Sequence, residues 1–444
     1  MRSAVVVGLG AAAALAAHQL FRWNRRRLRA LRQAGHTKLE LLPGERADIL
    51  CMSPATSTVT LYNGDFAAAA EHLITRVDEM VAANPWLAAV LDYDAESGEL
   101  NAYIPPDAAS RKLFEVLEGV ALSGDYGPLV KSLETAICVK PSIEAAGTGD
   151  PLFSVRLLRD LNAERRFALV VSANHSLVDG HGFYRLYNML SSEAKVEALD
   201  PTRKQELPAR MLAAMGDEPS PMTACPPGFL ASFVFAQVRS QLFPRTKAIG
   251  FDISAKWLAA QKATAAGGGV PFVSTNDCIV SCFLSCLDAD CGLMPVNFRG
   301  KLDGCDEHCA GNYEDLITYM RPDYATPALI RKSVGVPGDR RYRRAAEPPT
   351  AMLTNTQWLG GATVGVMTNW ATFARPLSLP GATQELHLPL FDFPKANPAS
   401  IMGSMVVFQP ASGRVAAMVA GSQRLIDAVA ASGIVGASVG VSYA

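Results

Sequence analysis

Residues 167–182, FALVVSANHSLVDGHG, contain the pattern on which the expected fold of this chain depends most. Residues 167–173 form a nearly continuous apolar run, which predicts a strand buried on both faces. A loop follows, and apolar residues then recur at helical spacing over residues 183–190. The sequence therefore places His175 in a loop where a buried strand gives way to a helix.

His175 is the candidate general base of this loop. Imidazole is the side chain whose ordinary pKa suits proton abstraction near neutral pH. Asp179 can fix a tight loop by local hydrogen bonds or by pairing with an arginine, and Gly180 permits backbone angles that other residues resist. A purely structural loop histidine is the alternative interpretation, and His181 is the competing histidine.

The segments outside this stretch mix strand and helix patterns. Residues 55–62 are strand-like, and residues 66–83 have helical spacing that ends before Pro85, because proline removes a donor and restricts the residue before it. Residues 86–93 and 100–104 predict paired strands around a polar turn. This mixture predicts an α/β fold of the α+β sandwich type rather than a bundle or barrel.

The chain of 444 residues exceeds one typical domain, so two domains are expected. Between residues 199 and 227 the composition shifts to proline, charge and small residues, as in a domain linker. We expect four parts: a targeting segment over 1–38, a first domain over 40–200 with the His175 loop, a linker or crossover over 201–245, and a second domain over 246–444.

Charge and cysteine content argue against several functions. With 41 basic and 42 acidic side chains the net charge is −1, so nucleic-acid binding is not expected. Nine cysteines, an odd number in a large chain, do not resemble a disulfide framework. Their recurrence every four residues over 278–286 is typical of a buried helix face. Cys305 and Cys309 raise zinc as an alternative, but a structural zinc site needs four ligands, so no metal site is expected.

The N-terminus has the pattern of a targeting segment. Residues 4–21 are apolar, six arginines follow between residues 22 and 32, and no acidic residue precedes Glu40. A cleaved secretory signal carries its positive charge before the apolar region, whereas this charge follows it. We therefore expect a signal anchor with the catalytic body in the cytosol, at the endoplasmic reticulum. A transit peptide for mitochondrion or plastid, or a helix lying on a membrane surface, are the alternatives.

The pattern His175-x-x-x-Asp179-Gly180 after a buried strand resembles the HxxxDG motif of the CoA-dependent acyltransferase superfamily, which includes chloramphenicol acetyltransferases, condensation domains and BAHD acyltransferases. The BAHD branch is the most similar, because further short matches follow in that family's order: STND at 274–277, VNFR at 296–299, GN at 311–312, TNW at 368–370 and DF at 392–393. The chain departs from these families at Asn174, where condensation domains carry a second histidine. It departs again after Phe393, where PKANP stands in place of Gly-Trp-Gly.

The resemblance implies two chloramphenicol-acetyltransferase-like domains with the active-site channel between them, preceded by the N-terminal apolar helix. Acyl-CoA would be the co-substrate, and His175 would take the proton from the hydroxyl or amine of a small-molecule or lipid acceptor. No cofactor would be bound, and the protein would be a monomer. Two alternatives are a membrane-associated wax-ester or glycerolipid acyltransferase and a non-catalytic binding relative.

The resemblance also implies roles for other residues. Asp179 would support the loop by pairing with Arg299, and Thr368 would be the oxyanion donor. The positions implied in substrate binding are Asn174, Gly180, Trp370, Asp392 and Phe393, with Trp370 lining the acceptor pocket.

Overall fold

The computed structural model describes residues 25–46, 48–122, 126–133, 136–137, 139–242, 246–265, 269–334, 342, 344–345, 350–391 and 401–443. The predicted apolar helix at 4–21 and the Asp392-Phe393 pair lie outside the described residues. Within those ranges no helix combines the length and apolar character needed to cross a membrane.

The first sheet contains the buried strand that the sequence predicts. Its five strands have the order β12-β2-β7-β6-β5, and central β7 is antiparallel to both neighbours. Every residue of β7 after Arg166 is buried, because alternate side chains point to opposite faces and both faces are covered. The strands are β2 (Thr56–Gly64), β5 (Phe114–Val120), β6 (Phe153–Asp160), β7 (Arg166–Ala173) and β12 (Ala382–Pro389).

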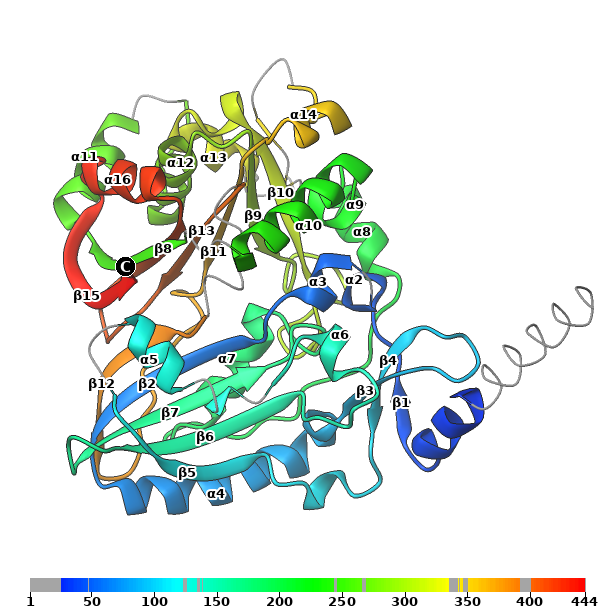
Figure 1. Ribbon diagram of the computed structural model, residues 1–444. Coiled ribbons are helices and arrows are strands. Elements are labelled where there is room, and N and C mark those ends of the chain that lie inside the picture. Colours follow the sequence, from blue (N-terminus) through cyan, green and yellow to red (C-terminus); the bar gives the residue numbers. More distant parts are fainter. Residues whose placement is uncertain are drawn as a thin grey trace, which may run out of the picture.

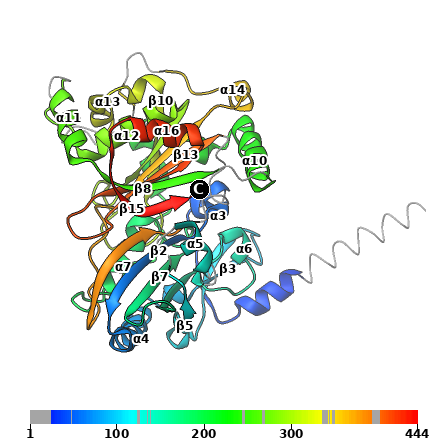
Figure 2. The same cartoon turned by 60° about the vertical axis from the view of Figure 1, so that its left-hand side comes forward.

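Two different cores lie on the two faces of β7. Leu169 and Val171 share one core with helices α4 (Phe66–Ala83) and α7 (Gly180–Met189). Val170, on the opposite face, shares another core with Met418 of the second sheet. Figures 1 and 2 show the half of the molecule built on this sheet below the half built on the second sheet. The loop that follows β7 lies where these halves meet, because the Asp179 N–H donates to the Gly311 carbonyl of the second half.

The second sheet has seven strands in the order β10-β9-β11-β13-β14-β8-β15. One of its faces packs against helices from the same half of the chain, with α12 at the centre. The strands are β8 (Lys247–Ile253), β9 (Cys291–Asn297), β10 (Glu314–Met320), β11 (Val364–Asn369), β13 (Met402–Phe408), β14 (Ala416–Gly421) and β15 (Val435–Tyr443). The helices are α11 (Ala255–Ala265), α12 (Thr275–Leu287), α13 (Pro327–Ser333) and α16 (Gln423–Ala431).

Strand β12 joins the two halves. It belongs to the range predicted as the second domain, yet it pairs with β2 at the edge of the first sheet, from Ala382 opposite Gly64 to Pro389 opposite Thr58. In Figure 1 this strand runs beside β2 in the lower half of the molecule. The first sheet is therefore completed only by a strand more than 300 residues away from β2 in sequence.

The predicted linker is largely helical. Within residues 201–245 the structure forms α8 (Leu207–Ala214), α9 (Pro221–Ala224) and α10 (Pro227–Leu242). Prolines at the first turns of these helices are compatible with helix, because those backbone N–H groups need no intrahelical partner. Helix α10 packs against α14 (Asn355–Leu359) of the second half.

A small third sheet, β1-β4-β3, contains the predicted pair of strands. The first of these was placed too early in the sequence, because Pro85 opens the 3₁₀ turn η1 (Pro85–Ala88) and the strand begins only at Val90. These strands are β1 (Thr37–Leu39), β3 (Val90–Tyr93) and β4 (Leu100–Ile104). The remaining short elements are α2 (Pro43–Arg46), α3 (Asp48–Met52), α5 (Tyr126–Ser132), α6 (Ser142–Ala145), η2 (Ala108–Ser110) and η4 (Arg321–Tyr324).

Candidate active site

The side chain of Asn174, the first residue of the His175 loop, holds this loop in place. The side-chain Oδ1 of Asn174 accepts hydrogen bonds from the Ser176 N–H (2.9 Å) and the Ser142 hydroxyl (2.8 Å). Its amide nitrogen donates to the Lys140 carbonyl (2.8 Å), and the side chain is fully buried. The structure thus places Asn174 as a support of the loop, with its side chain turned into the protein.

The ring of His175 is oriented by Asn312, from the second half of the chain. His175 Nδ1 lies 3.1 Å from the Asn312 side-chain oxygen, and the ring is half-buried. Because an amide oxygen can only accept, Nδ1 must carry the proton, and in the neutral ring Nε2 then holds the free lone pair. The loop therefore presents the nitrogen that can take a proton from a substrate.

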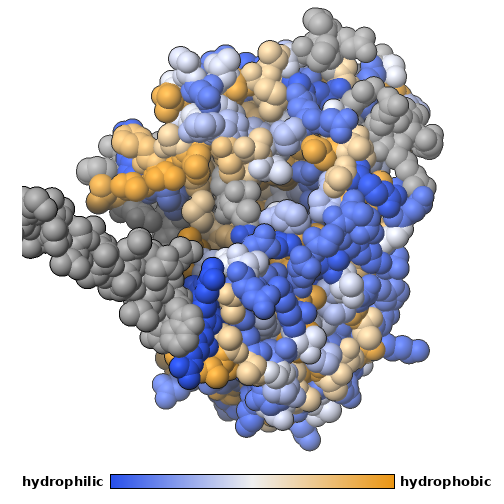
Figure 3. Space-filling view, turned by 90° about the vertical axis from the view of Figure 1, so that its right-hand side faces the viewer, coloured by the Kyte–Doolittle hydropathy of each residue, from blue (hydrophilic) through white to orange (hydrophobic). Residues whose placement is uncertain are grey.

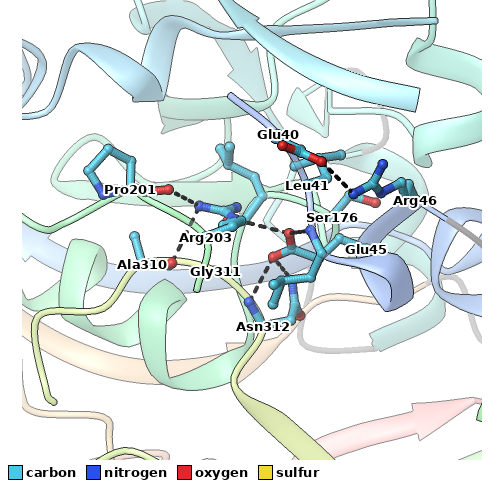
Figure 4. Close-up of polar contacts among 12 residues, drawn as sticks. Glu40, Leu41, Glu45, Arg46, Ser176, Pro201, Arg203, Ala310, Gly311 and Asn312 are labelled. Carbon is cyan, nitrogen blue, oxygen red and sulfur yellow. Dashed lines mark hydrogen bonds and ion pairs between the residues drawn. The ribbon is translucent and has the colours of Figure 1, made fainter. Parts of the chain in front are cut away.

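The amide of Asn312 is itself fixed in one orientation, and Figure 4 shows its contacts with Glu45. Its nitrogen donates to the His175 carbonyl (2.7 Å) and to Glu45 Oε1 (3.0 Å). The backbone N–H of Asn312 also donates to Glu45 Oε1 (2.8 Å). A flipped amide would direct its oxygen at the Glu45 carboxylate and at the His175 carbonyl, and both contacts would be repulsive.

Glu45 is a fully buried carboxylate in α2, and it has a buried counter-charge. Arg203 Nε lies 2.9 Å from Glu45 Oε2, and both side chains have no exposed surface. The other guanidinium N–H groups donate to the carbonyls of Leu177, Pro201 and Ala310. This pairing lets a charged group sit in the interior, because burial is tolerated only when the charge is paired and hydrogen-bonded.

Gly311 permits this packing. Its φ of +121° lies where side chains are disfavoured, and a Cβ there would be 3.0 Å from Arg203 Nε and 3.1 Å from Glu45 Oε1. Gly311-Asn312 is recognisable in the sequence as a short match, whereas neither Glu45 nor Arg203 could be predicted from it. The segment PGER around Glu45 has no pattern that indicates a site, because its partners are distant in sequence.

Asp179 and Arg299 come together in the arrangement that the resemblance implies. Arg299 Nη1 donates to Asp179 Oδ2 (2.7 Å), and both side chains are buried. Asp179 also accepts from the backbone N–H of Gly182 (2.8 Å), where it caps α7, and from that of Tyr313 (3.0 Å). The imidazole of His175 faces Asn312 instead, so the ring and Asp179 do not form a triad-like pair.

The electrostatics of this pair follow from its burial. Burial works to raise the pKa of the Asp179 carboxyl, but the Arg299 guanidinium and the backbone donors outweigh it, and the pKa lies below its ordinary value. On the neighbouring strand, burial and the Asp179 charge raise the pKa of Glu314 to about 8. The Asp179–Arg299 ion pair is therefore charged at neutral pH.

His181, the competing histidine, is packed between other groups. Its Nδ1 accepts from the Asn297 amide (3.3 Å), its Nε2 lies 3.3 Å from the Glu307 carboxylate, and Phe373 contacts its ring. Burial and the Arg299 charge lower the pKa of His181. Both ring nitrogens of His181 thus face protein groups, whereas among the described residues only Nδ1 of His175 has such a partner.

Thr368 and Trp370 lie at the C-terminal end of β11, and Trp370 contacts the His175 loop. A Cβ on Gly180 would lie 3.3 Å from the Trp370 indole nitrogen, so the indole packs directly on the HxxxDG turn. Trp370 also contacts Tyr184 of α7 and Phe391. The Thr368 hydroxyl makes no hydrogen bond within the part of the chain that the structure describes.

None of the cysteines in the described ranges forms a disulfide. In the same ranges, no three His, Cys, Asp or Glu side chains lie close enough together to bind a metal ion. Cys305 and Cys309, which raised the zinc alternative, are buried in the core of the second half. Burial raises the pKa of the Cys305 thiol to about 12.

Comparison with known proteins identifies the fold. No family model and no curated protein matches the chain. Among solved structures, F. sporotrichioides TRI101 complexed with coenzyme A and T-2 is 14% identical over 88% of this chain and 96% of that chain, with a TM-score of 0.53. Polyketide synthase associated protein 5 from Mycobacterium tuberculosis is 14% identical over 89% of this chain and 96% of that chain, with a TM-score of 0.52.

The first condensation domain of the calcium-dependent antibiotic synthetase, in complex with a substrate analogue, is also similar. It is 13% identical over 92% of this chain and 99% of that domain, with a TM-score of 0.54. These structures are matched over nearly their whole length, as the HxxxDG resemblance predicts. The chain therefore has the fold of the CoA-dependent acyltransferase and condensation-domain superfamily.

Proposed function

We propose that this protein transfers an acyl group from an acyl-CoA thioester to a hydroxyl or amine acceptor, with His175 as the general base. The observation that carries the proposal is the contact between His175 Nδ1 and Asn312 Oδ1, which leaves Nε2 as the basic nitrogen. The fold supports it, because the similar protein TRI101 is complexed with coenzyme A and a small molecule, T-2. Acyl-CoA and a small-molecule or lipid acceptor would be the partners.

The reaction would proceed by direct attack. As the acceptor oxygen or nitrogen forms its bond to the thioester carbonyl carbon, its proton passes to His175 Nε2. The carbonyl electrons move onto the oxygen of the tetrahedral intermediate, and the Thr368 hydroxyl is the proposed donor to this oxyanion, a role worth about 3 kcal/mol in other enzymes. When the carbon–sulfur bond breaks, the imidazolium returns the proton to the CoA thiolate.

The supporting residues would divide into two groups. Asn312 would position the His175 ring, and Asp179 would position the loop. Asn312 is held by Glu45 of the buried Glu45–Arg203 ion pair, and Asp179 is itself a member of the buried Asp179–Arg299 ion pair. Trp370, packed on Gly180, would form part of the acceptor pocket. Asp392 and Phe393 remain proposed substrate-binding positions. A lipid acceptor, as in wax-ester or glycerolipid synthesis, is the second candidate, and the apolar segment 4–21 favours it.

Release of free thiol from a panel of acyl-CoAs, each offered with hydroxyl and amine acceptors, tests the proposal. His175→Ala should lower turnover by about 100-fold or more, the usual contribution of a general base, and should leave the melting temperature nearly unchanged. His181→Ala is the matched control and should retain turnover. Near-normal turnover in His175→Ala together with its loss in His181→Ala would show that the base is misassigned.

A further inference from the structure

Helix α10 is apolar on both its inner and outer faces. Phe229 and Ala236 are buried on the inner face. Five apolar side chains on the outer face are 38 to 70% exposed, and we call this set the α10 face: Leu230, Val234, Phe235, Val238 and Leu242. Figure 3 shows apolar residues gathered there on the surface of the molecule. A helix that is apolar all round is normally covered, and contiguous exposed apolar patches mark interaction sites.

The α10 face lies on the same side of the molecule as the helix over residues 25–33. A cavity of about 350 Å³ lies between them, and its lining includes Tyr93, Ile143 and Leu230. The guanidinium of Arg29 lies over the ring of Tyr93, 5.3 Å from its centroid. The helix over residues 25–33, the cavity and the α10 face therefore form one surface.

The charge of this surface points to the partner. The sequence of residues 25–33, RRRLRALRQ, has five arginines and no acidic residue, and α10 has Arg239 and no acidic residue. Arg32 ties the arginine helix to the body through Asp92, at 2.9 Å. Apolar side chains beside clustered arginines match the acyl and headgroup layers of an anionic bilayer.

A second copy of the chain fits this surface less well. Twofold dimers bring the same patch of both subunits together, so the two arginine helices would approach each other. Like charges at such a contact are unfavourable, whereas anionic headgroups neutralise them.

We propose that the α10 face docks on the surface of an anionic lipid bilayer, with the helix over residues 25–33 at the level of the headgroups. This docking is distinct from an anchor at residues 4–21, because it belongs to the folded body and stands independently of the acyltransfer reaction.

Amide hydrogen exchange of the full-length chain, with and without vesicles of phosphatidylcholine and phosphatidylserine, tests the proposal. Exchange is the readout because residues 4–21 could bind vesicles by themselves, whereas docking of the body must protect residues 227–242. Vesicles should slow exchange in that segment, and neutral phosphatidylcholine vesicles should do so less. Phe235→Glu and Leu242→Glu should each weaken the vesicle-dependent protection by about tenfold or more, since each removes a large apolar side chain from the contact.

Leu161→Glu is the matched control, because Leu161 is 71% exposed at the turn between β6 and β7. It should leave the protection intact. Absence of any vesicle effect on residues 227–242 overturns the proposal. Because the hydrogen bonds of the helix already slow exchange, only a change in protection counts. Protection that grows with protein concentration in the absence of vesicles also overturns the proposal, since the cover is then a second copy.

Discussion

The side chain of Asn312 determines which nitrogen of His175 is free. Its oxygen accepts from Nδ1, and its nitrogen is engaged by the His175 carbonyl and by Glu45. Glu45 thus affects the His175 ring indirectly, because it prevents the Asn312 amide from flipping. Residues of this kind are positioning residues, and their effect should appear in the pH dependence of turnover as well as in its rate.

Asn312→Ala should lower kcat by about tenfold or more, with little change in the KM for acyl-CoA, because the ring loses its orienting acceptor. The pH–rate profile should shift at the same time, since Nδ1 is no longer tied to an amide oxygen. Asn101→Ala is the matched control: Asn101 is also buried and accepts a hydrogen bond from the Leu41 N–H, away from the ring. An unchanged kcat and pH profile in Asn312→Ala would refute the positioning role.

The Asp179–Arg299 pair should couple stability to activity. Asp179→Asn and Arg299→Gln should each cost roughly 3–5 kcal/mol, because each leaves a buried charge uncompensated, and their effects should be strongly non-additive. Turnover should fall with stability, because the pair holds the loop that carries His175. The exposed pair Arg414–Asp252 is the control, where the same exchange should cost under about 1 kcal/mol. Additive losses in a double-mutant cycle would contradict the pairing.

The Asp179–Arg299 pair also predicts the direction in which the stability of the folded chain changes with pH. The pKa of Asp179 is lower in the folded chain than its ordinary value, so its contribution is present above the ordinary carboxyl range and is lost as the pH falls. Chemical denaturation at decreasing pH should therefore show a steeper loss of stability in the wild-type chain than in Asp179→Asn.

At the scale of elements, the contact between β2 and β12 depends on Gly64. This residue has φ +154°, and a Cβ there would lie 2.5 Å from the Cα of Ala382, a backbone atom that cannot rotate away. Gly64→Ala should therefore lower stability by about 2 kcal/mol or more, as overpacking does. Thermal melting can measure the loss, with Gly44→Ala as control, because a Cβ at Gly44 meets nothing within 4 Å. Equal melting temperatures for the two variants would show that β12 yields easily.

Elements with a strong local pattern were predictable. The apolar run at 167–173 and the helical spacing at 66–83 became β7 and α4. Ser274 caps α12 with Asp277 as its reciprocal partner, as a turn that opens a helix should. The helices of the linker region were not predicted, because proline at a helix start and proline in a loop have the same local signature.

For the molecule as a whole, the remaining proposal concerns how the N-terminal segment 4–21 is oriented in a membrane. We propose that residues 4–21 anchor the protein with its catalytic body in the cytosol, because the arginines follow the apolar stretch. On intact microsomes, added protease should digest the body, and it should do so equally after the vesicles are opened with detergent. A body that is protected until detergent is added would reverse the topology, and recovery of the full-length chain without membranes would exclude the anchor.

Local sequence patterns were sufficient to predict the His175 loop, its setting between strand and helix, and the likeness to an acyltransferase fold, because these depend on residues that are neighbours along the chain. The contacts that hold the loop could be seen only once the chain was folded. Glu45, Arg203 and Asn312 come from three distant segments, and no local pattern indicates that a carboxylate in one and an amide in another share a hydrogen bond. The edge strand β12 is a similar case, since its pairing with β2 depends on the path of the whole chain rather than on local composition. Burial determines these pairings, because a charge in the interior or an unpaired strand edge is stable only when the fold brings a partner close to it.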